Sequence, residues 1–137
     1  MKSTSYHLKK DHTIQGIEHL TEIEDKEYLQ RQDIHYLCKF CKTRITSWKF
    51  KIKVYGKFKH ICVNPNGIIF ELGCFSDASN CVPTHNPTKE FTWFPGYAWQ
   101  VILCSTCLNH LGWLYTSNNS YFVGLILTNL IEEQEKN

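Results

Sequence analysis

The stretch FTWFPGYAWQVILCSTCLNHLGWLY, residues 91–115, joins a crowded aromatic segment to a pair of cysteines two residues apart. This pair, Cys104 and Cys107, has a counterpart upstream in Cys38 and Cys41. Two residues between cysteines allow a tight turn to direct both sulfurs at one ion, and four thiolates complete a tetrahedral structural zinc site. The two pairs therefore predict one structural zinc ion per chain, which joins regions far apart in the sequence.

The cysteine pattern leaves other interpretations open. A single CxxC pair can be a redox dithiol, and in an oxidising compartment the pairs could form disulfides. Two pairs that flank a β-rich segment favour zinc, and a metal with four protein ligands has no open position for catalysis. Of the other cysteines, Cys62 is predicted to lie in a buried strand. Cys74 and Cys81 fall in a polar segment, where they could bridge if oxidised.

Length and composition predict one globular domain that is unusually aromatic. The chain has 137 residues, 14% of them aromatic, and a net charge of +2 that is too small to indicate nucleic acid or an acidic membrane surface. No apolar signal segment opens the sequence, and the longest apolar run, residues 121–131, is too short to span a membrane. We therefore expect no nucleic-acid or membrane partner, and a cytoplasmic or nuclear location, or secretion if a signal peptide was removed.

Hydrophobic periodicity predicts mainly β structure after one helix. Apolar residues recur at helical spacing over residues 17–29, which predicts an amphipathic helix. Apolar residues alternate with lysines over residues 47–54, which predicts a half-exposed strand. The turn VNPNG, residues 63–67, should join residues 60–63 and 68–72 in a hairpin. A long loop is expected over residues 73–89, followed by strands at 99–103, 112–115 and 121–128.

Three segments together resemble a known family. YLCKFC (36–41), VNPNG (63–67) and the stretch 91–115, in this order, resemble the CULT domain, the thalidomide-binding domain of cereblon and of free-standing relatives. The resemblance divides the chain into an N-terminal tail and helix (1–35), a CULT domain (36–130) and a polar C-terminal tail (131–137). It implies a β-tent fold, in which zinc on the four cysteines pins two antiparallel sheets.

The resemblance also implies a ligand site, an aromatic cage for cyclic imides. The implied lining residues are Trp93, Trp99 and Trp113 as walls, Tyr115 at the base, Asn64 and Pro65 at the rim, and Phe91, whose main chain acts with that of Trp93. In the family, a backbone C=O accepts the imide N–H there and a backbone N–H donates to an imide carbonyl. Cereblon carries histidine at the position of Phe91, and losing that neutral hydrogen bond, worth about 1 kcal/mol, should weaken binding several-fold.

The predicted function is therefore non-enzymatic capture of cyclic imides by a zinc-containing domain. The ligands expected are glutarimide, thalidomide-type compounds, and peptides that end in a cyclic imide formed from Asn or Gln in damaged proteins. Cereblon also has a Lon-like domain and an adaptor-binding helical region, for which 137 residues leave no room. We therefore expect no ubiquitin-ligase adaptor to bind this chain.

Three alternatives compete with this prediction. The segments around Cys62 and Cys104 also resemble B-type methionine sulfoxide reductases, with Cys62 as the nucleophile; in those enzymes, however, the nucleophile follows the second CxxC pair and histidine replaces Trp113. An aromatic cage can bind methylated ammonium groups, with Glu90 as the acidic partner. A zinc-ribbon nucleic-acid binder would use lysines of residues 49–59, but the overall charge is nearly balanced.

Overall fold

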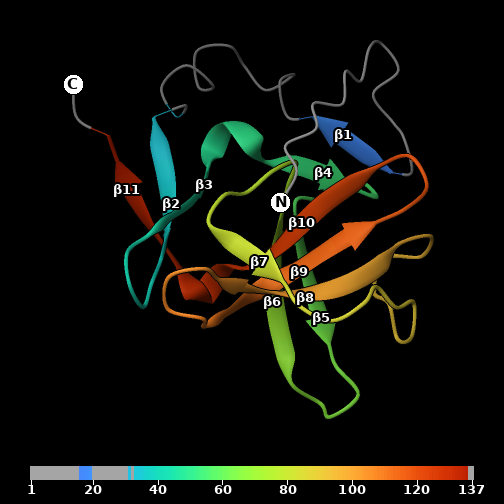
Figure 1. Cartoon of the computed structure of the whole chain (residues 1–137). Helices are drawn as coiled ribbons and strands as arrows, with labels where there is room; N and C mark the ends of the chain where they lie inside the picture. Colours follow the sequence, from blue (N-terminus) through green and yellow to red (C-terminus); the bar gives the residue numbers. More distant parts are fainter. Residues whose placement is uncertain (1–15, 20–30, 32, 136–137) are drawn as a thin grey trace.

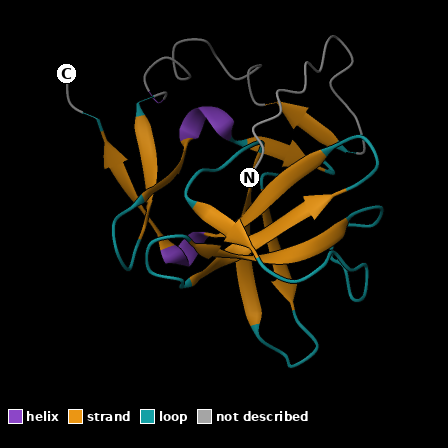
Figure 2. Cartoon of the chain, in the orientation of Figure 1, coloured by secondary structure: helices purple, strands orange, loops and turns teal. Residues whose placement is uncertain are grey.

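The computed structural model of the chain describes residues 16–19, 31 and 33–135 (Figure 1). Short strands dominate this part of the chain, with two single turns of 3₁₀ helix between them (Figure 2). The strands are β1 (Ile17–His19), β2 (Ile34–Cys38), β3 (Arg44–Ser47), β4 (Ile52–Val54), β5 (Lys59–Val63), β6 (Ile69–Phe75), β7 (Cys81–Pro83), β8 (Ala98–Cys104), β9 (His110–Thr116), β10 (Tyr121–Ile126) and β11 (Leu130–Gln134), and the 3₁₀ turns are η2 (Trp48–Phe50) and η3 (Leu127–Asn129).

Two antiparallel sheets form the body of the domain. The larger has six strands in the order β5-β6-β10-β9-β8-β7, and the smaller has three in the order β11-β2-β3. A separate two-stranded pair joins β1 to β4. The prediction of a mainly β fold built on two antiparallel sheets is confirmed. No helix in the part of the chain that the structure describes is long and apolar enough to cross a membrane.

The hydrophobic core divides into two clusters that serve different parts of the molecule. One cluster, which includes Tyr36, Trp48 and Phe75, draws its residues from both main sheets. The second contains Phe94 and Tyr97, which are 1% and 0% exposed. These two aromatic side chains anchor the segment before β8 in the core and so fix the base of the aromatic stretch.

The prediction of an amphipathic helix over residues 17–29 is wrong at its start. Ile17–His19 form β1, which pairs antiparallel with β4, and Ile17 lies opposite Val54. The pairing satisfies the backbone of β1 and buries Ile17, which is 5% exposed, so tertiary contacts override the local helical spacing. Residues 20–30, which carry the rest of the expected helix, lie outside the described residues.

The strand expected over residues 47–54 is interrupted. Trp48–Phe50 form the 3₁₀ turn η2, closed by a hydrogen bond from the Lys51 amide to the Trp48 carbonyl. A 3₁₀ turn has three residues per turn, so it breaks the period-two alternation of the strand. Ile52 and Val54 are buried and Lys53 is exposed as expected, but Lys51 is half-buried.

The loop expected over residues 73–89 contains strand structure at two points. Strand β6 continues to Phe75, and Cys81–Pro83 form β7, which pairs with β8. Cys74 and Cys81, expected in a polar loop, are buried free thiols in different core clusters. The polar composition of the segment hid these short strands, because a three-residue strand such as β7 is too short to show a hydrophobic period.

The smaller sheet extends beyond residue 130, the expected end of the domain. Strand β11 runs to Gln134 and pairs with β2, with Leu130 opposite Cys38. Residues 131–134 of the expected C-terminal tail therefore belong to the sheet. Three exposed side chains in succession on this edge strand, Glu132, Glu133 and Gln134, gave its sequence the polar composition of a tail.

Candidate functional site

Four cysteine sulfurs meet where the two main sheets approach each other. Four sulfurs, those of Cys38, Cys41, Cys104 and Cys107, all lie within 4.8 Å of one another. The Cys41 and Cys104 sulfurs are 3.5 Å apart, and the Cys38 and Cys107 sulfurs are 3.6 Å apart. A tetrahedral zinc ion with Zn–S bonds of about 2.3 Å places its sulfurs about 3.8 Å apart. The cluster is therefore shaped for a metal ion of this kind, and it includes all four cysteines of the predicted set.

Two turns of the same geometry present these sulfurs. In the first, the Lys42 amide donates to the Cys38 carbonyl at 2.7 Å, and Lys42 has a left-handed φ of 66°. In the second, the Leu108 amide donates to the Cys104 carbonyl at 2.8 Å, and Leu108 has a φ of 63°. The first turn joins β2 to β3 and the second joins β8 to β9, so a bound ion would connect the two main sheets.

Polar neighbours favour the thiolate form of the two more accessible cysteines. The Thr43 hydroxyl lies 3.2 Å from the Cys41 sulfur, and hydrogen bonds from Thr43 lower the pKa of Cys41 to about 6. The Asn109 amide donates to the Cys107 sulfur at 3.2 Å and lowers the pKa of that thiol. Such outer-shell donors orient metal ligands and stabilise their negative charge.

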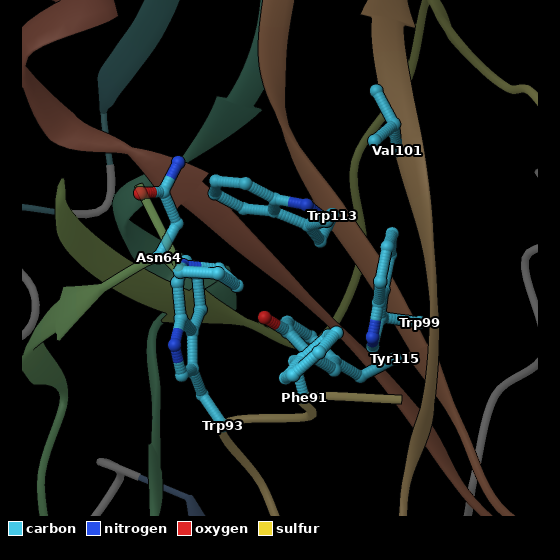
Figure 3. Close-up of a pocket in the computed structure, with 8 residues that line it drawn as sticks. Asn64, Phe91, Trp93, Trp99, Val101, Trp113 and Tyr115 are labelled. Atoms are coloured by element: carbon cyan, nitrogen blue, oxygen red, sulfur yellow. The ribbon is translucent and has the colours of Figure 1, made fainter. Parts of the chain in front are cut away.

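An aromatic cavity of about 250 Å³ lies beside β8 and β9 (Figure 3). Strand β8 contributes Trp99 and β9 contributes Trp113 and Tyr115, and Trp99 lies directly opposite Tyr115 in the sheet. The β5–β6 turn and the segment before β8 supply the other walls. The complete lining is Asn64, Pro65, Phe91, Trp93, Trp99, Val101, Trp113 and Tyr115, so the structure brings together all seven residues expected at the ligand site.

Sequence reasoning missed one lining residue, Val101. It follows Trp99 by two positions on β8 and lies opposite Trp113 in the sheet. Side chains two apart on a strand share a face, so the period of the strand would have identified Val101 once Trp99 was assigned to the cavity.

Hydrogen bonds and ring contacts hold the three indoles in place. The Trp93 Nε1–H donates to the Val63 carbonyl at 3.0 Å, and the Trp99 Nε1–H donates to the Glu90 carbonyl at 2.7 Å. The Trp93 and Trp113 rings meet edge to face, with centroids 5.0 Å apart. Because these indole N–H groups are already paired, the walls present mainly aromatic faces.

Aromatic packing also fixes the base of the cavity. The Tyr115 ring stacks on Phe122 with 4.9 Å between centroids, and Phe94 contacts Tyr115 edge to face at 4.7 Å. Tyr115 is 1% exposed, and burial raises its pKa. A side chain at Gly124 would place its Cβ 3.0 Å from the Tyr115 ring, so glycine there gives the ring its space. The base is therefore rigid and uncharged.

The rim of the cavity is more polar. The Asn64 side-chain oxygen accepts hydrogen bonds from the Asn66 and Ile68 amides, both at 2.9 Å, which hold the β5–β6 turn. Phe91 is 73% exposed and has a left-handed φ of 57°, an uncommon conformation for an aromatic residue. Within the described part of the chain, no hydrogen bond uses the Phe91 carbonyl oxygen or the Trp93 amide. One acceptor and one donor of the main chain therefore remain available here.

The residues named in the alternatives lie in less suitable surroundings. Cys62 lies on β5, is 7% exposed, and burial raises its pKa to about 11, whereas a thiol nucleophile needs a lowered pKa. None of the eight described residues that line the cavity is acidic, and Glu90, the expected acidic partner, is not among them. The cavity thus has neither a nucleophile nor a carboxylate for an ammonium group.

Together the fold and the site define a class: a mainly β domain that has a four-cysteine cluster suited to a metal ion and, lined by other residues, a neutral aromatic cavity. The chain is 39% identical to cereblon of Danio rerio over 83 residues, 58% of this chain and 19% of that protein. It is 39% identical to cereblon of Gallus gallus over 83 residues and 33% identical to cereblon of Drosophila melanogaster over 82 residues. No family model matches the chain.

These similarities, with the cysteine cluster and the mainly β fold, support a cereblon-like CULT domain in this chain. The match covers 18% of the chicken protein and 14% of the Drosophila protein. The chain therefore spans less than a fifth of the length of these relatives.

Proposed function

We propose that the aromatic cavity binds cyclic imides, and that the domain acts as a binding module without catalytic activity. One observation carries the proposal: three indole walls stand next to an unpaired backbone carbonyl at Phe91 and an unpaired backbone amide at Trp93. A glutarimide ring has apolar methylenes at one end and an acceptor–donor–acceptor edge at the other. The indole faces suit the methylenes, and the two backbone groups suit the edge.

The size and charge of the cavity support a small neutral ligand. Its volume of about 250 Å³ is below the roughly 300–1,000 Å³ of sites for drug-sized ligands. The lining residues carry no charged side chain, so an ion would lose hydration without gaining a partner. A neutral imide loses less hydration free energy than an ion when it moves from water into the cavity, and it regains hydrogen bonds with the main chain.

The cavity is open at its rim, so larger ligands that end in an imide ring are also proposed to bind. Phe91, Asn64 and Pro65 line the cavity, and both Phe91 and Pro65 are exposed. A substituent on the imide ring would leave the cavity between these residues. Thalidomide-type compounds and peptides with a C-terminal cyclic imide both have such substituents, and both are proposed ligands.

Titration with glutarimide, followed by tryptophan fluorescence, tests this proposal. We expect a saturable change in the native chain and its loss in Trp99→Ala, because that substitution removes one wall. Val82→Ala is a matched control, since Val82 is exposed on the neighbouring strand β7 and does not line the cavity. No saturable change up to millimolar ligand, or an unaltered response in Trp99→Ala, would refute the proposal.

We further propose that the cysteine cluster holds one structural zinc ion. Four protein sulfurs leave no position for a reactive water, so the ion would stabilise the fold and would not take part in chemistry. Elemental analysis of protein purified under reducing conditions should find one zinc per chain; less than half an equivalent would argue against the site. The cytosol or the nucleus would keep these thiols reduced, and such a location remains a prediction.

The proposal is limited to ligand capture by this domain. The proposed function includes no coupling to a ubiquitin ligase, no binding of nucleic acid and no insertion into membranes. The reductase alternative has its own test: if methionine sulfoxide is reduced by the native chain and not by Cys62→Ser, the domain is an enzyme and the proposal of a pure binding module fails.

A further inference from the structure

A second cavity, of about 240 Å³, lies between the two main sheets. Its lining shares no residue with the aromatic cage and is Tyr36, Lys51, Phe58, Leu127, Leu130 and Glu132. Tyr36 comes from β2 and Glu132 from β11 of the smaller sheet, while Phe58 and Leu127 rest on Gly73 of β6. The walls are mainly apolar, and a lysine projects among them.

Aromatic rings surround the Lys51 amine. Its nitrogen lies 4.6 Å from the ring centroid of Phe58, 5.5 Å from that of Tyr36 and 5.9 Å from that of Trp48. The backbone of Lys51 is held in two ways. Its amide donates to the Trp48 carbonyl at 3.0 Å, and it forms an isolated antiparallel β-bridge with the backbone of Phe75. The amine therefore occupies a defined position at the wall of the cavity.

The charged groups near the cavity shift the pKa of the Lys51 amine in opposite directions. Burial lowers the pKa of Lys51, the positive charge of Arg31 acts in the same direction, and Glu132 acts against both. Burial raises the pKa of the Tyr36 phenol, and the negative charge of Glu132 acts in the same direction. The described ion pairs with carboxylates are made by His35, Arg44 and Lys59, so none of them holds the Lys51 nitrogen.

We propose that Lys51 captures small aldehydes with an apolar body as a reversible imine in this cavity. The neutral amine attacks the carbonyl carbon, a C–N bond forms as the C=O π bond breaks, and a proton passes from the nitrogen to the oxygen to give a carbinolamine. Loss of water then forms the C=N bond, and addition of water reverses the sequence, so no oxidant or reductant is required. A desolvated lysine in an apolar pocket is suited to this chemistry.

The cavity suits an aldehyde better than a carboxylate. An aldehyde is neutral, so Glu132 does not repel it, and its apolar body can pack against Phe58, Leu127 and Leu130. The protonated imine spreads its charge over carbon and nitrogen and is less dependent on hydration than the compact ammonium group. The aromatic faces and Glu132 stabilise that cation as they stabilise the ammonium.

Two neighbouring lysines provide internal controls. Lys49 and Lys53 flank Lys51 in the sequence and are exposed. Each unit by which a lysine pKa falls makes the reactive neutral amine about tenfold more abundant at neutral pH. Selective modification of Lys51 over these two residues therefore reports its surroundings rather than local sequence.

The test is reductive trapping of the full chain at pH 7.4 with benzaldehyde and sodium cyanoborohydride, followed by peptide mapping. We expect Lys51 to be modified at least about fivefold faster than Lys49 and Lys53, and the difference to disappear in urea. Lys51→Arg, which keeps the charge over the rings, should lose the dominant adduct while its circular dichroism spectrum stays native. Equal rates at the three lysines in folded protein would overturn the proposal. The Trp99→Ala variant should react as the native chain does, which separates this site from imide binding.

Discussion

The two cavities of the molecule have similar volumes, about 250 and 240 Å³, but different chemistry. The cage beside β8 and β9 has no charged side chain, and its polar groups are the main chain at Phe91 and Trp93 and the side chains of Asn64 and Tyr115. The cavity between the sheets combines aromatic and aliphatic walls with Lys51 and Glu132. Space alone therefore does not determine the ligand: the first cavity suits a neutral ring with a hydrogen-bonding edge, and the second suits an electrophile that an amine can attack.

The largest expected effect concerns the whole fold, because the four-cysteine cluster joins turns of the two main sheets. Replacing Cys41 by serine should prevent stable zinc binding and abolish the cooperative unfolding transition, since structural zinc contributes on the order of 10 kcal/mol. Thermal denaturation followed by circular dichroism measures this. Ser105→Ala is the control, because Ser105 is exposed in the other cysteine turn and supplies no sulfur. A native transition in Cys41→Ser would show that metal does not hold the sheets together.

The next largest effect concerns the close packing of β9 on β10, which supports the cage. A Cβ at Gly112 would lie 2.0 Å from the Gly124 carbonyl oxygen, so Gly112→Ala must displace the backbone between β9 and β10. We expect a loss of about 3 kcal/mol or more in the free energy of unfolding, with displacement of Trp113 and weaker imide binding.

Gly67→Ala is the matched control for Gly112→Ala. Gly67 has a φ of 85°, and a Cβ there meets nothing within 4 Å, so only backbone strain of about 1–2 kcal/mol is expected. Chemical denaturation of the two variants gives the comparison. Equal losses would mean that close packing of β9 on β10 does not support the cage.

The third prediction concerns the buried thiol beside the cage. Because burial raises the pKa of Cys62 from 9.0 to about 11, its thiolate should be about 100-fold less abundant at pH 8 than that of a free thiol. Alkylation by iodoacetamide, mapped by mass spectrometry, should therefore be slow at pH 8 and should accelerate as the pH rises towards 11. Reaction of Cys62 at pH 8 as fast as N-acetylcysteine would contradict this prediction and revive the reductase alternative.

The smallest expected effect concerns the side chain at position 91, on the rim of the cavity. Phe91→His introduces a side chain that can donate one neutral hydrogen bond to an imide carbonyl, worth about 1 kcal/mol. We expect several-fold tighter binding of glutarimide above the pKa of the new histidine, measured by fluorescence titration at pH 8. Phe91→Leu serves as the control for loss of the aromatic ring. A Phe91→His variant that binds more weakly than Phe91→Leu would show that the side chain at this position does not contact the imide.

Motifs predicted the parts of the molecule in which residue type and spacing are tightly constrained. The four cysteines were identified because a tetrahedral site requires two close pairs, and the structure brings their sulfurs together. The seven cage residues were named through a family resemblance, and all of them line one cavity. That they bind an imide remains a prediction.

Local patterns failed where tertiary contacts determine the structure. The apolar spacing that begins at Ile17 suited a helix, but pairing with β4 makes this segment a strand. The lysine alternation placed Lys51 on a solvated face, but Lys51 directly follows the 3₁₀ turn η2, is half-buried, and has its amine against aromatic rings. The second cavity was therefore not predictable, because its walls come from strands that meet only in the folded chain.

A comparison of glutarimide with N-methylglutarimide tests the central claim most directly. The two ligands have similar apolar bodies, but the methyl group removes the N–H that the Phe91 carbonyl would accept. We predict saturable binding of glutarimide to the native chain by isothermal titration calorimetry, and binding of the N-methyl compound at least about tenfold weaker. Equal binding of the two ligands, or no binding of either up to millimolar concentration, would contradict recognition of the imide edge by the main chain.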